Sequence, residues 1–329
     1  MNAKMKIIVT GAAGFIGGHV MEKLSKANYE VLGIDNFSSY YSPSMKSAHI
    51  DKIVNSNVLV GDVCDRTFVF NLFNEYKPDF LVHLAAQGGV RASKVEPFPY
   101  LATNQSGFLN VIEAAELVNV KKFIYASSSS VYGEGLETPF REDARLFAPK
   151  SLYALSKLSN EYIALNLPSN GMQRIGLRFF TVYGPWGRPD MAIFRLLASS
   201  LLNKEFILTG NLEIVRDFTY VNDVVDCISF SISDLVKLEN EIFNVAGSNP
   251  HSLSQLVNTI QDLGIELNVR KTDKNSLDIQ KTHGSSEKLN EYGFPIPSTL
   301  LKVGIKNTWN WLCNQNLNDL KEWFDYKIH

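Results

Sequence analysis

The hydrophobic positions in the first half of the chain fall in short runs that alternate with longer amphipathic stretches. Runs such as Ile7-Ile8-Val9 and Phe80-Leu81-Val82 contain no polar residue that could face water. Strands covered on both faces show this pattern, and their alternation with helices is typical of a parallel sheet built from βαβ units. We predict strands at 6–10, 30–34, 57–60, 80–84, 122–126 and 174–179, and helices at 15–27, 66–76, 103–118 and 153–166.

The regular alternation ends after residue 181. Residues 183–189 read YGPWGRP, which is a turn-rich loop, and residues 271–286 are polar enough to predict an exposed loop. One more strand is predicted at 241–245, and helices near 253–263 and 305–312. We therefore expect an α/β fold, a Rossmann-type doubly wound parallel sheet with a smaller mixed α/β C-terminal substrate domain. The predicted boundaries are 1–180 plus about 216–247 for the nucleotide-binding domain, and about 181–215 plus 248–329 for the substrate domain.

Composition narrows the class of protein. The 329 residues are 45% hydrophobic and 20% charged, and the net charge of −2 carries no footprint for nucleic acid. The first apolar run begins at Ile7 and ends in glycine, too short for a signal sequence or a membrane span. Cys64, Cys227 and Cys313 are scattered and odd in number, which fits a reducing cytosol and predicts neither a disulfide framework nor a metal site.

A glycine turn follows the first predicted strand. Gly11 permits a tight turn, Gly14 allows a close approach to a pyrophosphate, and Gly17 allows close helix packing. The spacing is GxxGxxG, and glycines at such positions also serve plain turns. The following strand ends at Asp35, where an acid would bind the adenosine ribose and favour NAD over its 2′-phosphorylated form. The predicted NAD-binding residues here are Gly11, Ala13, Gly14, Phe15, Ile16, Gly17, Asp35 and Asn36.

Later strand ends point to the same edge of the sheet. Ligands of an open α/β sheet bind outside the carboxyl ends of its strands. The alternative for each position is a loop turn or a helix cap. The residues we add to the predicted cofactor site are Asp62, Val63, Leu84, Ala85, Ala86, Gln87 and Asn104.

A tyrosine and a lysine stand four residues apart in a predicted helix. This spacing places Tyr153 and Lys157 on one helix face. A neighbouring ammonium and a nicotinamide cation both favour the phenolate, so we expect the pKa of Tyr153 to fall toward neutrality. Four serines, Ser127 to Ser130, leave a buried strand toward the cofactor and offer a hydroxyl to relay a proton. Such a set can move a hydride and a proton on or off a carbinol.

Several segments together resemble the extended short-chain dehydrogenase/reductase superfamily. They read MKIIVTGAAGFIG, HLAAQGGVRAS, ASSSSVYG, SLYALSK, LRFFTVYGPWGRPDMA and RDFTYVNDV. Within it they resemble the nucleotide-sugar 4-epimerases, and most closely the UDP-glucuronate 4-epimerases. The resemblance covers most of the chain up to about residue 247. It implies tightly held NAD, a UDP-sugar substrate and a homodimer paired through helices of the nucleotide-binding domain.

The resemblance also implies residue roles. It makes Tyr153 the base, Lys157 its partner and Ser128 the catalytic hydroxyl. Arg188 would bind the sugar carboxylate and Arg216 the diphosphate. Further substrate-side positions are Arg91, for which a solvated loop arginine is the alternative, and Ser127, Ser129, Ser130 and Thr181.

The chain departs from the family pattern in two places. Trp186 and Gly187 replace the Arg-Gln pair of the usual GPRQRPDM segment, which changes the surroundings of the carboxylate. Residues 276–279 read SLDI where the family usually carries a Gly-Asp-Val type segment, so the uridine contacts there are left unassigned.

The serine run also separates the reaction classes. Related dehydratases carry an Asp-Glu pair, and decarboxylases a glutamate, where Ser129 and Ser130 stand. The resemblance therefore implies C4 epimerisation through a 4-keto sugar, with UDP-glucuronate converted to UDP-galacturonate. The alternatives are a 4-epimerase of UDP-glucose or of a UDP-N-acetylhexosamine or its uronate, a net NAD-dependent dehydrogenase or reductase, and an inactive NAD-binding scaffold.

Overall fold

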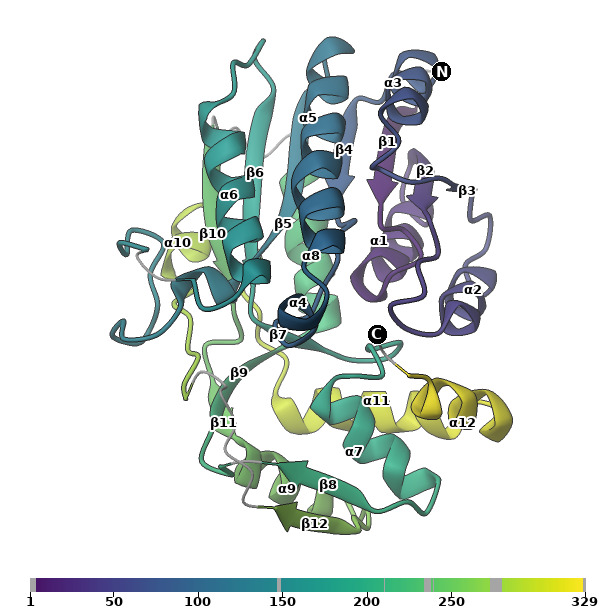
Figure 1. The fold of residues 1–329 in the computed structure, drawn as a ribbon, viewed down its shortest axis with the longest axis vertical. Helices are drawn as coiled ribbons and strands as arrows, with labels where there is room; N and C mark the ends of the chain where they lie inside the picture. The colour runs from purple at the N-terminus through teal and green to yellow at the C-terminus, as the bar shows by residue number, and fades with distance from the viewer. Residues whose placement is uncertain are drawn as a thin grey trace.

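A seven-stranded parallel sheet forms the centre of the larger part of the molecule (Figure 1). The computed structural model describes residues 4–146, 149–209, 211–233, 238, 240–272 and 280–327. The strand order is β10-β6-β5-β4-β1-β2-β3, which confirms the predicted doubly wound sheet. The strands are β1 (Met5–Thr10), β2 (Tyr29–Asp35), β3 (Val58–Val60), β4 (Phe80–His83), β5 (Lys122–Ser128), β6 (Gln173–Phe179) and β10 (Asn240–Val245).

Helices cover both faces of this sheet. Alternate residues of β1 belong to different cores: Ile8 belongs to the core that contains Phe108, whereas Ile7 and Val9 belong to the core that contains Val224. This two-sided burial explains the apolar runs of β1 and β4. One face carries α3 (Arg66–Tyr76), α5 (Phe108–Leu117) and α6 (Leu152–Asn166), and the other carries α1 (Phe15–Ser25) and α8 (Val221–Ile232).

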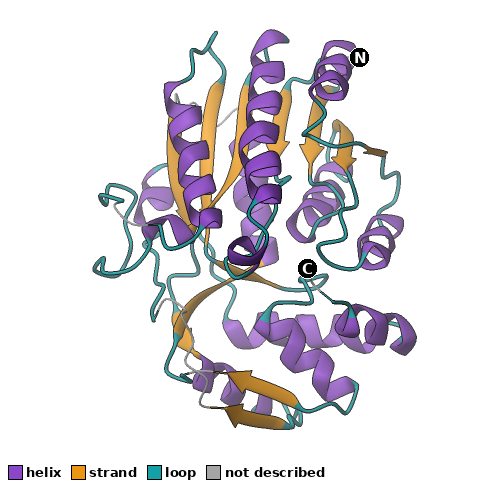
Figure 2. Cartoon of the chain, in the orientation of Figure 1, coloured by secondary structure: helices purple, strands orange, loops and turns teal. Residues whose placement is uncertain are grey.

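The strand order reverses between β1 and β4, and the smaller part of the molecule lies below the carboxyl ends of the strands (Figure 2). Ligands bind at such a reversal point. A three-stranded sheet in the order β11-β9-β7 and the strand pair β12-β8 belong to this part. Its elements are β7 (Thr181–Tyr183), α7 (Ala192–Leu201), β8 (Phe206–Thr209), β9 (Val215–Tyr220), β11 (Pro250–Ser252), α9 (Leu253–Gln261), β12 (Val269–Thr272), α11 (Leu301–Cys313) and α12 (Leu317–Asp325); three short helices, α2 (Pro43–Asp51), α4 (Ala92–Val95) and α10 (Glu287–Glu291), lie elsewhere along the chain.

The chain passes between the two parts more than once. It leaves the large sheet after β6, forms β7 to β9, and returns through α8 and β10. The residue boundaries that we predicted for two domains stay a prediction.

Two predicted segments differ from the structure. The helix expected from residue 103 is instead a π-helical segment, Tyr100–Gly107, that continues into α5, and Asn104 within it bonds to the backbone of Gln87. The exposed loop predicted at 271–286 is wrong at both ends, and residues 271 and 272 belong to β12. Ser285 and Ser286 are buried and bonded to Phe140 and Ala246, while residues 273–279 lie outside the described residues, together with the unassigned 276–279 segment.

Candidate active site

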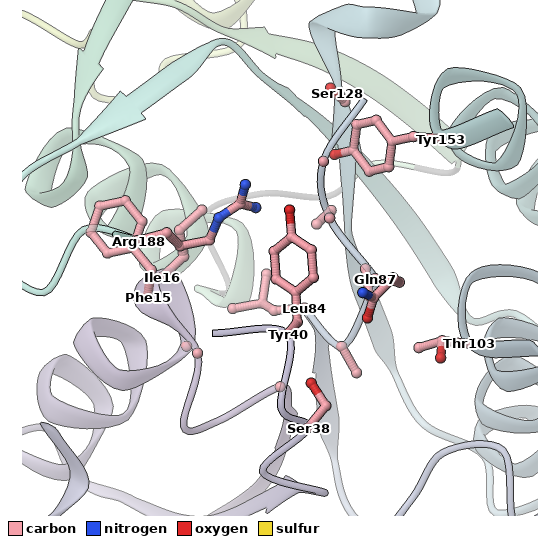
Figure 3. Close-up of a pocket in the computed structure, with 18 of the residues that line it drawn as sticks. Phe15, Ile16, Ser38, Tyr40, Leu84, Gln87, Thr103, Ser128, Tyr153 and Arg188 are labelled. Carbon is pink, nitrogen blue, oxygen red and sulfur yellow. The ribbon is translucent and has the colours of Figure 1, made fainter. Parts of the chain in front are cut away.

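A cavity of about 670 Å³ opens at the carboxyl ends of the strands (Figure 3). Its volume lies within the range of roughly 300–1,000 Å³ that is typical of small-molecule sites. Most of the residues predicted from the sequence line it. These are Gly11, Gly14, Phe15, Ile16, Gly17, Asp35, Asn36, Asp62, Val63, Leu84, Ala85, Ala86, Gln87, Ser127, Ser128, Ser129, Ser130, Tyr153, Lys157, Thr181 and Arg188.

The glycine turn closes the end of the cavity between β1 and α1. Gly11 has a φ of +69°, and a Cβ on it would lie 2.6 Å from the amide nitrogen of Ala85. A Cβ on Gly17 would lie 1.9 Å from the carbonyl oxygen of Gly11. The N-cap of α1 is Gly14, which has no side chain to cap the helix, so the N–H groups of Ile16 and Gly17 in its first turn remain available to an anion.

Acidic residues line the neighbouring part of the cavity. The Asp35 carboxylate accepts hydrogen bonds from the amides of Ala13 (3.0 Å) and Phe37 (2.8 Å), which leaves lone pairs for ribose hydroxyls. Asp62 accepts from the Cys64 amide at 2.8 Å and from Asn36 at 3.0 Å. Burial alone would raise the pKa of Asp62, but these hydrogen bonds outweigh it and hold the pKa below its usual value.

These features fit an NAD molecule. A close-packed glycine turn, an uncapped helix start and a hydrogen-bonded acid at the end of β2 are the three parts that bind a pyrophosphate and an adenosine ribose. The backbone itself provides this fit to NAD. A side chain on Gly11 or Gly17 would overlap neighbouring backbone atoms, so only glycine allows this turn.

Asn104 acts behind the cavity wall. Its side chain accepts from the Gln87 amide at 2.7 Å and donates to the Gln87 carbonyl at 3.0 Å. It also donates to Ser156 Oγ, which in turn donates to the Tyr153 carbonyl. Asn104 therefore ties the loop after β4 to the first turn of α6, and its own side chain is buried.

The structure brings Tyr153 and Ser128 together (Figure 3). A hydrogen bond from Ser128 and the positive charge of Arg188 favour the phenolate, but burial acts more strongly, and the pKa of Tyr153 is raised. The fall toward neutrality that we predicted is therefore wrong for the protein alone. Our expectation depends on the positive charge that an oxidised nicotinamide supplies when bound.

Lys157 is fixed one helical turn beyond Tyr153. Its Nζ donates to the carbonyl of Ala126 at 2.8 Å, and only 3% of the residue is exposed. Burial lowers the pKa of Lys157 to about 8, although the negative charge of Glu161 opposes this. The lysine thus titrates much closer to neutrality than in water.

A buried ion pair lies behind the serine strand. Arg178 binds both oxygens of Glu161, at 2.9 and 2.8 Å, and Glu161 also accepts from Ser127. The Ser127 hydroxyl proton is therefore committed to Glu161, whereas Ser128 Oγ donates to Ser130 Oγ at 3.1 Å. Of these three serines, Ser128 and Ser130 are better placed to meet a substrate.

Arg188 projects into the cavity from the loop after β7 (Figure 3). Its Nε and Nη2 donate to the two oxygens of Asp190, at 2.9 and 2.6 Å. The Tyr40 hydroxyl donates to the same carboxylate at 3.3 Å, and the guanidinium lies 5.3 Å from the Tyr40 ring. Nη1, which Asp190 does not use, approaches Gly88 so closely that a Cβ there would lie 2.4 Å from it.

Trp186 anchors this loop to other elements. Its ring stacks on His49 of α2 at 4.6 Å and contacts Trp311 and Trp323 at 5.0 and 5.8 Å. Trp186 adopts a φ of +59°, which is unusual for a residue with a side chain. The replacement noted in the sequence thus connects the loop that carries Arg188 to α2, α11 and α12.

Four predicted residues lie outside the cavity lining. Ala13 is buried beneath Asp35, and Asn104 lies behind Gln87. Arg91 is exposed at the start of α4, and Arg216 lies in β9 of the smaller sheet, where it donates to Val215. The roles predicted for all the site residues stay predictions.

The sequence did not point to several residues at or beside this site, among them Ser38, Tyr40, Lys46 and Asp190. The first three belong to the segment after Asp35, and Asp190 comes two residues after Arg188. Only their nearness in sequence to Asp35 or Arg188 could have indicated that they belong to the site. Side-chain contacts across the cavity, such as Tyr40 with Asp190, depend on the fold.

Two structural features bear on other classes of ligand. Among the described residues, no cluster of three or more His, Cys, Asp or Glu side chains is placed to hold a metal ion. No helix within the described ranges is long and apolar enough to cross a membrane.

Known proteins resemble this chain over most of its length. Residues 7–246 match the NAD dependent epimerase/dehydratase family. UDP-glucuronate 4-epimerase 3 of Arabidopsis thaliana is 36% identical over 93% of this chain and 76% of its own. The structure of UDP-glucuronic acid 4-epimerase from Bacillus cereus, in complex with UDP-glucuronic acid and NAD, superposes with a TM-score of 0.87 at 31% identity, covering 94% of this chain and 99% of that one. UDP-glucose 4-epimerase from Thermotoga maritima, with UDP-glucose, gives a TM-score of 0.85 at 31% identity and the same coverage of each chain.

Proposed function

Because the chain belongs to the NAD dependent epimerase/dehydratase family and is an NAD-dependent UDP-sugar 4-epimerase, we propose that its substrate is UDP-glucuronate. The product is then UDP-galacturonate. The observation that carries this choice is Arg188, a cation inside the cavity whose charge reaches Tyr153. Asp190 occupies the Nε/Nη2 edge of the guanidinium, and the Nη1 side is left to bind the C5 carboxylate.

The proposed acid/base steps use Tyr153 and Ser128. When bound, NAD supplies the hydride acceptor and donor of the reaction. Tyr153, as the phenolate, accepts the proton of the C4 hydroxyl, through or beside Ser128. After the 4-keto sugar has turned to present its other face, Tyr153 returns the proton. Lys157 favours the phenolate through its positive charge.

A keto intermediate with a neighbouring carboxylate can lose carbon dioxide. The loss requires the bond to the carboxylate to align with the carbonyl π-system. We propose that Arg188, Thr181 and the serine run hold the sugar in another conformation. Serines, and not carboxylic acids, stand at positions 129 and 130, where related dehydratases carry the acids that eliminate water. This supports epimerisation over elimination.

A specific observation also favours a neutral hexose. Asp190 already neutralises much of the Arg188 charge, so the cavity does not strictly require an anionic sugar. The similarity to the Thermotoga maritima UDP-glucose enzyme supports the same alternative. The two substrates are therefore the ones to compare first.

The test is incubation of the purified protein with UDP-glucuronate, UDP-glucose and UDP-N-acetylglucosamine, with products identified by NMR. We expect conversion of UDP-glucuronate to UDP-galacturonate without added reductant. A kcat/KM for UDP-glucose equal to or above that for UDP-glucuronate would contradict the proposed substrate and leave the 4-epimerase activity intact.

We also infer a homodimer, formed through α5 and α6. The outer face of α6 exposes Leu155, Tyr162 and Leu165 to 47%, 58% and 44%. Exposed apolar side chains that gather on one helix face commonly mark a protein interface.

A further inference from the structure

Lys46 is a buried cation beside the cavity. It lies in α2, whose N-cap is Ser42, and only 5% of the residue is exposed. Its Nζ donates to the Ser38 carbonyl at 2.7 Å and to Ser38 Oγ at 3.2 Å. Both Lys46 and Ser38 line the cavity. An ammonium has three donors, so one remains for a ligand.

No carboxylate among the described residues forms an ion pair with Lys46, and the two oxygens to which it donates are both neutral oxygens of Ser38. A ring face adds to the site, because Nζ lies 4.7 Å from the centroid of Tyr41. Burial lowers the pKa of Lys46, and the negative charge of Asp35 offsets this only in part. A buried charge without a counter-ion is unfavourable, and an anionic ligand would compensate it.

The surroundings of Lys46 lead to the start of α1. The hydroxyl of Tyr41, the ring beneath Lys46, meets the backbone amide of Phe15, the first residue of that helix. The charge of Lys46 also interacts with Asp35 and with Arg188, which both line the cavity. Tyr41 thus links the ammonium of Lys46 to the start of α1, and Lys46 lines the same cavity as Asp35 and Arg188.

We propose that Lys46 is a further dinucleotide-binding residue that pairs with the pyrophosphate of NAD. It would act together with the N–H groups of α1, which face the same anion. The proposal concerns the cofactor and does not depend on which UDP-sugar is the substrate.

The C-terminal helix α12 positions the segment that aims Lys46. Ser42 Oγ and Ser44 Oγ donate to the two oxygens of Glu322, at 2.7 and 2.5 Å. Trp323 Nε1 donates to Ser44 Oγ at 3.1 Å. Tyr326 reaches back to the Ser39 carbonyl, also at 3.1 Å. Residues of α12 and the tyrosine after it therefore hold the start of α2 and the residues before it in place.

The decisive variant is Lys46→Met, which keeps the length of the side chain and removes its charge. Lys52→Met, at the exposed end of the same helix, is the matched control. The NAD content of each purified protein is measured first. Titration calorimetry on protein freed of cofactor then gives the affinities for NAD, ADP and adenosine. We expect Lys46→Met to bind NAD and ADP about tenfold to a hundredfold more weakly, with adenosine almost unaffected.

Thermal unfolding separates ligand binding from a structural role. Removal of an uncompensated buried charge should leave the unfolding midpoint of the cofactor-free variant equal to or above that of the wild type. The rise of the midpoint on adding NAD should be smaller than in the wild type. Unchanged NAD affinity with a lower midpoint would assign Lys46 a structural role only and overturn the proposal. Equal losses for ADP and adenosine would overturn the pyrophosphate assignment. Neither result would bear on the UDP-sugar activity.

Discussion

Tyr153 is the residue whose proton the proposed reaction moves. Ser128 and Arg188 favour its phenolate, whereas burial favours the phenol. Tyr153→Phe removes the hydroxyl and keeps the ring. We expect the fold and UDP-sugar binding to persist while kcat falls by about 10²–10⁴-fold, which is typical for a positioned acid/base group. Steady-state kinetics and a UDP titration check this, and near wild-type turnover would exclude Tyr153 as the proton carrier.

Arg188 is the residue that tests substrate identity. If its Nη1 side holds the C5 carboxylate, Arg188→Ala loses a charge-assisted hydrogen bond of about 1.5–3 kcal/mol. That corresponds to a loss of about 10–150-fold in kcat/KM for UDP-glucuronate, with a much smaller loss for UDP-glucose. NMR of the products should also show some UDP-4-keto-pentose, because a loosened carboxylate can align for decarboxylation.

The control for this variant follows from the ion pair. Arg188→Ala leaves Asp190 without its partner, so Arg188→Ala/Asp190→Asn is the matched double variant. Equal losses for both substrates in the double variant would place Arg188 on the diphosphate or in loop stability. The carboxylate assignment would then fail.

Individual residues show how far the sequence leads. The contact of Tyr153 with Ser128 follows from motif spacing, and the structure brings the two together. The pairing of Arg188 with Asp190 and Tyr40 did not follow, because Tyr40 lies 150 residues before Asp190. The direction of the Tyr153 pKa also required burial, which a motif does not contain.

At the scale of an element, α6 carries three functional positions in line. Tyr153, Lys157 and Glu161 succeed one another at four-residue spacing, so all three lie on one helix face. Ser151 caps the helix, and its Oγ accepts from the Ala154 amide at 3.1 Å. The Ser151 cap fixes the helix start beside Tyr153, and the ion pair with Arg178 fixes Glu161.

The alignment of Tyr153, Lys157 and Glu161 on α6 predicts how kcat/KM depends on pH. Burial lowers the pKa of Lys157 to about 8, and without the negative charge of Glu161 this pKa would be lower still. Glu161→Gln removes that negative charge, so the pKa of Lys157 falls further. Because the ammonium supports the phenolate, the alkaline limb of the kcat/KM profile should move to lower pH.

Glu161→Gln also leaves Arg178 without a carboxylate, so the unfolding midpoint is measured alongside the pH profile. Glu113→Gln, an exposed acid on α5, is the control. An alkaline limb that stays in place in a folded Glu161→Gln enzyme would contradict the coupling of Glu161 to Lys157.

Elements differed in how well their pattern predicted them. Strands β1 to β6 were predicted to within two residues at either end. Burial on both faces leaves apolar runs in β1 and β4, whereas the edge strand β3 is short and exposes Val60. β7 and β11 have three residues each and pair with β9 from distant parts of the chain, so no local periodicity announces them. The π-helical segment that precedes α5 contains Asn104, whose contact with Gln87 is not visible in the local periodicity.

At the scale of the whole molecule, one helix faces both the site and the solvent. α6 presents Tyr153 and Lys157 to the cavity and Leu155, Tyr162 and Leu165 to the outside. α5 lies beside it on the same face of the sheet (Figure 1). A partner molecule packed on these helices would bury the apolar residues and fix the helix that carries the catalytic pair.

We therefore predict a dimer that Leu155→Glu/Tyr162→Glu converts to a monomer, because two carboxylates would be buried there without partners. Light scattering coupled to size-exclusion chromatography measures the mass. Val60→Glu is the control, since Val60 is 76% exposed on the edge strand β3.

If the dimer fixes α6, the monomer should retain NAD but lose kcat, because the cofactor site lies mostly on other elements and Tyr153 lies on α6. A monomeric wild type, or a double variant that stays dimeric, would rule out this face as the interface. A monomer with full kcat would show that α6 needs no partner to position Tyr153.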